Sequence, residues 1–385
     1  MDRSGVLKNG IIHTALLCLQ ICAVLGAAGA DSVLAAGTKG AAAAGADSVL
    51  AAGTKGATTA GEDSVLTVWV VGDLLLDRGV RAEIGRSGAD RLFDGVRPLF
   101  RTADAVIANL ECPVTEQHAP LEKKYVFRAE PRWLTALRAA GITHVTLANN
   151  HSNDQGREGL THTLKALAGN GIGAMGGGAQ QEAACAPVLL EKNGIRLAVF
   201  AANFVPLENW MYDADRPGPC EPTSDDLVRN IRSFLASSPG AHCIAVVHWG
   251  WEFRAEPNEE QSALAQALLD AGAEAVIGHH PHVIQTVERS GDKTVVYSVG
   301  NFVFDQRAED ARRALAVKLL VTGRGIDVRL VPLRISACAP APMPRRDAAA
   351  LLRAVAARSH GVAFTRAGGE WRVTTTSNSR GGTQQ

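Results

Sequence analysis

Three histidines, His279, His280 and His282, stand within four residues, just after an apolar run that ends at Ile277. Imidazole is the commonest metal ligand in proteins. The apolar run is typical of a buried strand, and open α/β sheets bind ligands beyond the carboxyl ends of their strands. An extended backbone, which Pro281 favours in the residue before it, would point the side chains of His280 and His282 to one side. We expect these two histidines to bind metal, and His279 to pack behind them or support them.

Polar side chains follow five other apolar runs in the same way. Taken singly, each has an ordinary explanation as a helix cap, a turn residue or a hydrogen-bonded core histidine. Their coincidence at the ends of successive strands favours one shared site, because these ends meet at one edge of a sheet. The clusters are Gly72-Asp73, Asn109 to Glu111, Asn149 to Asp154, His248 to Glu252, and Gly300-Asn301.

The expected metal ligands combine carboxylates, an amide and imidazoles, and they include no thiolate. Such a set suits Mn, Fe or Zn rather than Ca or an iron–sulfur cluster. Six ligands are too many for one catalytic metal that keeps open positions. They fit two divalent metal ions that activate a water for hydrolysis. The predicted ligands are Asp73, Glu111, Asn150, His248, His280 and His282.

Other side chains near these clusters are candidates for proton transfer and substrate binding. His151 lies beside a predicted ligand and is expected to protonate a leaving group. Asp154 and Glu252 are the further catalytic candidates. An anionic substrate, either a phosphoester or an anionic polymer, needs donors, and the predicted substrate-binding residues are Arg78, Asn109 and Asn301.

Alternating strand and helix patterns must position these side chains. The predicted strands cover residues 66–71, 105–108, 144–148, 196–201, 243–247, 273–277 and 294–298. The predicted helices cover residues 131–140, 159–168, 225–236 and 259–271, with Ser224 and Asn258 as N-caps of the last two. Residues 315–320 and 327–333 predict an antiparallel hairpin. The alternation predicts an α/β domain over a mostly parallel sheet core.

The N-terminal residues have a different character. Arg3 and Lys8 precede an apolar run that ends in Ala28-Gly29-Ala30, which predicts a cleaved signal peptide or an uncleaved N-terminal anchor. A repeat of the type ADSVLAAGTKGA follows and predicts a flexible linker. We therefore expect export to the cell envelope or periplasm, with or without a membrane anchor. The expected regions are 1–30 (signal or anchor), 31–63 (Ala/Gly-rich linker), 64–336 (catalytic-type domain) and 337–385 (C-terminal helix and polar tail).

Charge and cysteine content narrow the function classes. The chain has 39 basic and 39 acidic side chains, and this balance argues against nucleic acid as a partner. The five cysteines beyond the N-terminal apolar run include no CxxC pair. They allow a Cys185–Cys220 disulfide without favouring it. Cys112 is expected to be a small buried apolar residue.

Six ordered motifs resemble the CapA family of bacterial capsule and poly-γ-glutamate synthesis proteins, over residues 66–333. They are GDLLLDRGV, NLECPVT, TLANNHSNDQG, HWGWE, GHHPHVIQ and YSVGNFVFDQ. That family resembles calcineurin-like metallophosphoesterases, which implies a four-layer sandwich of two mixed sheets flanked by helices. By this resemblance Asp73 matches the first metal aspartate, and Glu111 stands where phosphoesterases place a bridging aspartate. Asn150 and His151 match their Asn-His pair, and His248, His280 and His282 match their later histidines.

One position departs from the phosphoesterase pattern, and two hypotheses about function follow. Those enzymes open with Asp-x-His, but the residue two after Asp73 is Leu75. The first hypothesis is an exported metal-dependent hydrolase that acts on a phosphoester or a capsule-type polymer. The second is a non-catalytic accessory or binding subunit of a polymer synthesis and export complex, beside membrane-embedded capsule synthesis proteins. The missing histidine favours the second, and the retained polar ligands favour the first because burying them is costly.

Overall fold

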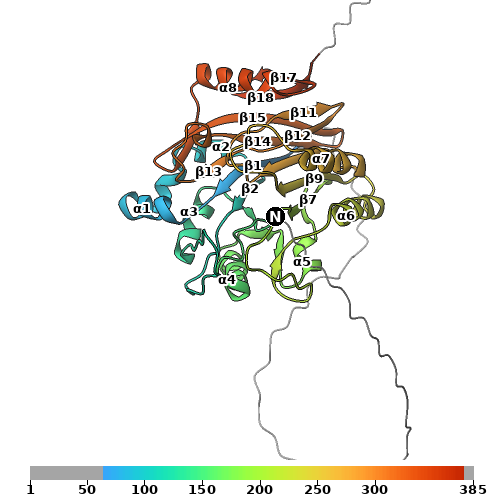
Figure 1. Ribbon diagram of the computed structural model, residues 1–385. Helices are drawn as coiled ribbons and strands as arrows, with labels where there is room; N and C mark the ends of the chain where they lie inside the picture. Colours follow the sequence, from blue (N-terminus) through green and yellow to red (C-terminus); the bar gives the residue numbers. More distant parts are fainter. Residues whose placement is uncertain (1–63, 377–385) are drawn as a thin grey trace, which may run out of the picture. The chain divides into compact units, whose positions relative to one another are not determined.

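The computed structural model describes residues 64–376. The predicted signal segment and repeat linker, and the last residues of the predicted tail, 377–385, lie outside the described residues. The described chain folds as two β-sheets that pack face to face between helices (Figure 1). Among residues 64–376, no helix combines the length and apolar character needed to cross a membrane.

The larger sheet is centred on β1 (Leu66–Leu74). On one side β1 pairs in parallel with β2, and parallel pairing continues through β3 to β4. On the other side β14 and β15 add the predicted antiparallel hairpin, while β13 pairs in parallel with the end of β1. The bounds are β2 (Ala105–Leu110), β3 (His144–Thr146), β4 (Gly173–Met175), β13 (Asn301–Val303), β14 (Arg313–Thr322), β15 (Gly325–Ser336) and β16 (Ala339–Pro342).

The second sheet has the strand order β11-β12-β10-β9-β7-β6. Its four central strands are parallel, and β6 and β11 pair antiparallel at the two edges. The bounds are β6 (Val188–Lys192), β7 (Ile195–Asn203), β9 (His242–His248), β10 (Ala275–His279), β11 (Val287–Ser290) and β12 (Lys293–Val296). A small separate pair joins β5 (Gly177–Gly178) to β8 (Gly218–Pro219).

Alternation along the strands divides the core into three apolar layers. In β1, Trp69 and Val71 face a cluster that includes Leu137 and Leu160 from helices on the outer face of the larger sheet. Leu66, Val68 and Val70, which alternate with these residues along β1, face the second sheet instead. The outer face of that second sheet packs on two further helices. The layers are therefore helix, sheet, sheet and helix, and the predicted α/β sandwich of two mixed sheets is confirmed.

Helices α6 and α7 begin and end within one residue of their predicted bounds. Helix α7 (Glu259–Ala271) has the predicted bounds, with a capping box at Asn258 and a left-handed Gly272 at its end. Helix α6 (Ser224–Ser237) is capped by Thr223, one residue before the predicted cap. The remaining bounds are α1 (Arg78–Ser87), α2 (Arg97–Phe100), α3 (Leu134–Ala139), α4 (Gly156–Gly169), α5 (Gln181–Cys185) and α8 (Arg345–Ala357).

The segment after Ser336 corrects the expected polar tail. The predicted helix is present as α8, but β17 (Val362–Ala367) and β18 (Glu370–Thr375) form a hairpin that extends the larger sheet. Trp371 of β18 pairs with Leu330 of β15. Val362 and Val373 are buried in the layer between the sheets, and this apolar alternation holds the hairpin in place.

Candidate metal centre

The predicted site residues gather at the carboxyl ends of strands from both sheets. Asp73 lies near the end of β1, in register with Asn109 of β2 on one side and Asn301 of β13 on the other. His248 ends β9 and is in register with His279, which ends β10. Each sheet thus delivers polar side chains to one shared edge, as the strand-end clusters predict.

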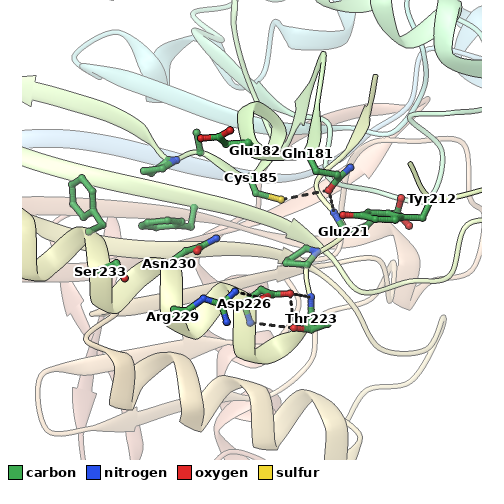
Figure 2. A pocket seen from close by; sticks show the side chains of 15 residues that line it. Gln181, Glu182, Cys185, Tyr212, Glu221, Thr223, Asp226, Arg229, Asn230 and Ser233 are labelled. Carbon is green, nitrogen blue, oxygen red and sulfur yellow. Dashed lines mark hydrogen bonds and ion pairs between the residues drawn. The ribbon is translucent and has the colours of Figure 1, made fainter. Parts of the chain in front are cut away.

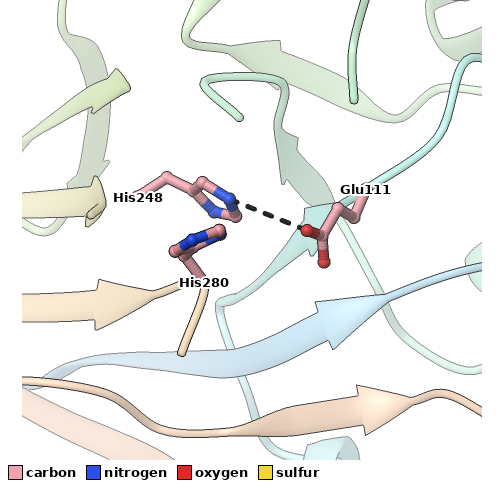
Figure 3. A group of neighbouring side chains, drawn as sticks. All are labelled: Glu111, His248 and His280. Atoms are coloured by element: carbon pink, nitrogen blue, oxygen red, sulfur yellow. Dashed lines mark ion pairs between the residues drawn. The ribbon is translucent and has the colours of Figure 1, made fainter. Parts of the chain in front are cut away.

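Two groups of potential ligands share one carboxylate. Glu111, His248 and His280 form the first group (Figure 3), and Asp73, Glu111 and His282 form the second. Within each group the ligand atoms lie within 4.8 Å of one another, and all five side chains are buried. Five of the six predicted metal ligands therefore converge, with Glu111 at the centre.

The carboxylate of Glu111 is buried without a hydrogen-bond partner. The residue is 1% exposed, and neither side-chain oxygen has a partner. Its Oε1 lies 3.7 Å from His248 Nε2 and 3.9 Å from His282 Nε2. Burial and the charge of Asp73 raise the pKa of Glu111 well above its usual range. Orphaned buried oxygens are rare and costly, so this donor set fits a divalent cation.

The histidines divide into two electrostatic classes. Burial lowers the pKa of His280 to about 3, and burial with the neighbouring His280 lowers the pKa of His248 well below its usual value. Both are therefore neutral, the form that binds metals. Burial also opposes charge on His282, but Glu111 and the Asp73 hydrogen bond outweigh it and raise its pKa to about 9. Without a cation, His282 thus serves as the positive partner of Asp73.

Asn109 connects a carboxylate to an imidazole within the site. Its Nδ2 donates to Asp73 Oδ1 at 2.8 Å and lies 3.2 Å from His248 Nδ1. Its Oδ1 accepts from Asn149 Nδ2 at 2.9 Å. The fully buried Asn109 therefore orients two predicted ligands. Its predicted substrate contact stays a prediction.

Two further asparagines hold the histidines. The Oδ1 of Asn150 lies 2.9 Å from Nε2 of His248, so Asn150 lies beside the first ligand group. Asn301 is fully buried, and its Oδ1 is 2.9 Å from Nδ1 of His282. The Nδ2 of Asn301 donates to Ala311 O and to Gln306 Oε1. Asn301 thus fixes the ring of His282, and its predicted contact with substrate remains untested.

His151 and Asp154 form a buried pair next to these ligands. The Nδ1 of His151 lies 2.9 Å from Asp154 Oδ2, and the ring of Phe127 packs at 4.3 Å from the imidazole. Burial lowers the pKa of His151 despite Asp154. Lys123, which is not among the predicted site residues, places its Nζ 2.7 Å from Asp154 Oδ1 and donates to Asn150 O at 2.8 Å. Lys123 belongs to a polar segment with no periodicity, so no sequence signal marks it.

Arg78 and Glu252 are less closely tied to the ligand groups. Arg78 forms an ion pair of 2.5 Å with Asp305, and its guanidinium lies over the rings of Phe127 and Phe304. Phe127 packs on His151 and Phe304 packs on His282, so Arg78 covers both aromatic neighbours of the site. Glu252 is exposed on the loop after β9. The predicted roles of Arg78 and Glu252 remain predictions.

The backbone around Pro281 differs from the expected extended form. His280 has φ of 95° and His282 has φ of 58°, both in the region that side chains with a Cβ rarely adopt. The expectation of an extended His280-Pro281-His282 segment is therefore wrong, because the chain turns sharply after β10. Both rings still reach Glu111. His279 Nε2 lies 3.0 Å from Val71 O. His279 belongs to neither ligand group, and its contact with Val71 is a supporting one.

Within residues 64–376, the cysteines form one disulfide, two buried free thiols and one partly buried free thiol. Cys185 and Cys220 form a disulfide that joins the end of α5 to the segment after β8. Cys112 is fully buried in the apolar layer beside the larger sheet, as expected, and burial raises its pKa.

Comparisons with known proteins agree with the motifs. The family described as bacterial capsule synthesis protein PGA_cap matches residues 67–306. Capsule biosynthesis protein CapA of Bacillus anthracis is 31% identical over 284 residues, which covers 72% of this chain and 69% of that protein. PGA biosynthesis protein CapA of Bacillus subtilis (strain 168) is 32% identical over 284 residues, which covers 71% and 73%.

Solved structures also resemble the fold at low sequence identity. NAD nucleotidase of Haemophilus influenzae has a TM-score of 0.42 and 10% identity, over 76% of this chain and 56% of that chain. The family match covers the second sheet, the parallel strands of the larger sheet and every predicted metal ligand. The chain belongs to the family of bacterial capsule synthesis proteins PGA_cap.

Proposed function

We propose that the chain is an exported metal-dependent hydrolase that acts on a capsule-type polymer such as poly-γ-glutamate. The observation that carries the proposal is the orphaned carboxylate of Glu111, buried between His248, His280, His282 and Asp73. A protein scaffold has little use for a buried carboxylate without a partner, whereas a divalent cation satisfies it. The relatives named above support the polymer class, because their names refer to capsule and PGA biosynthesis.

The residues have separate roles in this proposal. One or two ions of Mn, Fe or Zn would be held by Asp73, Glu111, Asn150, His248, His280 and His282. When bound, such ions act as Lewis acids and lower the pKa of a bound water. His151, oriented by Asp154, would deliver a proton to the leaving group from its protonated form, which Asp154 favours and burial opposes. Asn109 and Asn301 hold the ligand side chains in place.

Export is part of the proposal. The Cys185–Cys220 disulfide supports it, because disulfides persist in oxidising compartments such as the periplasm and the cell surface. Under this proposal the N-terminal segment directs the chain to the cell envelope, and the partners are membrane-embedded capsule synthesis proteins. Mass spectrometry of the secreted or envelope fraction tests it. A mature N-terminus near residue 31 or an anchored full-length chain supports export, and a cytoplasmic full-length chain contradicts it.

Metal content and turnover test the hydrolase. The purified full-length protein is assayed for bound metal and for cleavage of poly-γ-glutamate and a phosphoester, beside Glu111→Gln and His280→Ala. We expect stoichiometric metal and turnover in the wild type, with both lost in the two variants. Arg229→Gln, on the surface of α6, is the matched control and should behave as the wild type. A folded wild type that binds no added metal and cleaves neither substrate would contradict the proposal.

An accessory, non-catalytic role is the second candidate, and one observation favours it. Leu75 stands where phosphoesterases carry a metal histidine, and it is fully buried in the apolar layer. The position is thus used for packing and offers no ligand. A protein that retains polymer binding but shows no metal-dependent turnover would select this candidate.

A further inference from the structure

The loop between β9 and α7, residues 249–258, is held rigidly beside the metal centre. Buried Gln285 donates through Nε2 to Arg254 O at 3.1 Å and to Glu256 O at 3.0 Å. Gln261 in turn donates to Gln285 Oε1 at 2.9 Å. The backbone N–H of Phe253 donates to Pro281 O at 2.8 Å, which fixes the loop to the histidine segment.

This rigid loop presents aromatic side chains to solvent. Trp251 is 62% exposed and Phe253 is 53% exposed. Phe253 has φ of 60°, so the fold accepts backbone strain to place its ring outside the core. That ring lies 6.2 Å from the ring of His282. Exposed aromatic side chains next to a buried polar site are typical of a binding surface.

Two hollows meet at Ala255 of the same loop. One, of about 510 Å³, is lined by Trp251, Arg254 and Glu256 among others. The other, of about 120 Å³, runs from Phe253 and Val283 to Arg358 at the end of α8. Because Val283 follows His282 directly, the second hollow begins beside the metal centre.

The charges in these hollows favour an anion that also carries N–H donors. The lining includes Arg254, Arg313 and Arg358 against Glu256 and Asp310. Arg313 is paired with Asp310 and Glu309. Within residues 64–376, Arg254 and Arg358 form no ion pair, and the bonds of Arg358 go to the carbonyls of Ala354 and Ile284. A guanidinium that forms no ion pair within the protein is suited to bind a carboxylate of a ligand.

A larger cavity elsewhere in the described chain has a lining of different charge. It has a volume of about 800 Å³ and lies between α5 and α6 (Figure 2). Its lining carries Glu182, Glu221 and Asp226 against the single cation Arg229. That cavity repels a polyanion, so charge distinguishes the two surfaces.

We propose that the 249–258 loop and its two hollows form a subsite for a carboxylate-bearing polyamide chain, which they feed to the metal centre. Arg254 and Arg358 bind pendant carboxylates, Glu256 accepts an amide N–H, and Trp251 and Phe253 pack on the methylene groups between them. The proposal rests on the proposed function, because it names the substrate of the same centre. A mixed lining of this kind selects a polyamide over a purely anionic chain such as polyphosphate.

Binding without turnover tests the subsite. Fluorescence anisotropy follows an end-labelled γ-linked glutamate oligomer added to the full-length protein in EDTA. We expect Trp251→Ala and Arg254→Gln each to weaken binding about tenfold, the typical cost of one well-made contact. Arg358→Gln should also weaken binding about tenfold. Because Arg358 donates to two backbone carbonyls, a loss of stability could weaken binding in this variant as well. Trp251 and Arg254 are exposed, so their variants keep the test independent of folding.

Controls separate the possible outcomes. Arg229→Gln removes a cation from the other cavity and should leave binding unchanged, and polyphosphate of equal length should bind at least about tenfold more weakly. Wild-type binding that all three loop-side variants retain would overturn the subsite, as would equal binding of polyphosphate. If the oligomer binds as expected but no turnover follows metal addition, the subsite stands and the hydrolase proposal fails.

Discussion

Glu111 Oε1 lies 3.7 Å from Nε2 of His248, yet neither oxygen of Glu111 accepts a hydrogen bond. The carboxylate therefore bears the cost of burial unless it is protonated or bound to a cation. We expect Mn or Zn to stabilise the wild type, with a gain of about 2.7 kcal/mol in the free energy of unfolding when the metal is at a hundredfold excess over its Kd. The melting temperature should rise accordingly. Glu111→Gln should remove this gain and leave the metal-free protein equally stable or more stable. Thermal denaturation with and without EDTA measures both effects.

Asn109 should be essential to the metal centre without being a ligand itself. Asn109→Leu keeps the approximate size but removes the amide donor to Asp73 Oδ1 and one of the two acceptors of Asn149 Nδ2. We expect a loss of about 2 kcal/mol of stability and a drop of about tenfold to a hundredfold in metal affinity. Urea unfolding and metal titration test these two effects. Unchanged affinity would mean that Asn109 does not orient the ligands.

The Cys185–Cys220 disulfide should stabilise the fold independently of the metal. It closes a loop with a sequence separation of 35 residues, which corresponds to about 4 kcal/mol of chain entropy in the unfolded state. Replacing both cysteines by serine should lower the stability accordingly. The matched control is Cys338→Ser, since Cys338 is a free and only partly buried thiol. Equal stability of the disulfide-free variant and the control would contradict the prediction.

The strand ends could be predicted because apolar runs followed by polar residues are local signals. Asp73, Glu111 and His248 converge for that reason, and the caps at Asn258 and Gly272 fix the bounds of α7. The turn at His280 could not be predicted, because tertiary contacts impose its positive φ against the local preference before proline. The β17–β18 hairpin was missed because it depends on pairing with the distant β15.

The His242–Glu274 pair should make stability depend on pH away from the site. The hydrogen bond to Glu274, 2.6 Å from His242 Nδ1, raises the pKa of His242 above its usual 6.5 although burial opposes this. A group whose pKa is higher in the folded than in the unfolded protein contributes its full stabilisation below the unfolded pKa. This stabilisation is lost as the pH rises through the folded pKa. His242→Gln should therefore cost more at pH 6 than at pH 9, by up to about 1 kcal/mol for a partly exposed pair. Urea unfolding at the two pH values tests the sign.

Lys123 and Asp154 form an ion pair that is almost fully buried, with side chains 1% and 0% exposed. Lys123→Met leaves the charge of Asp154 uncompensated beside His151 and should cost about 3–5 kcal/mol. The double variant Lys123→Met/Asp154→Asn should be less destabilised than the sum of the single variants, because no charge is then left unpaired.

The exposed pair Lys192–Asp104 provides the matched control, and Lys192→Met should cost less than about 1 kcal/mol. A double-mutant cycle by urea unfolding gives the coupling energy for both pairs. A coupling between Lys123 and Asp154 no larger than that of the surface pair would show that Lys123 does not hold Asp154. In that case the orientation of His151 would depend on Phe127, whose backbone N–H donates to Asp154 Oδ2 at 2.7 Å.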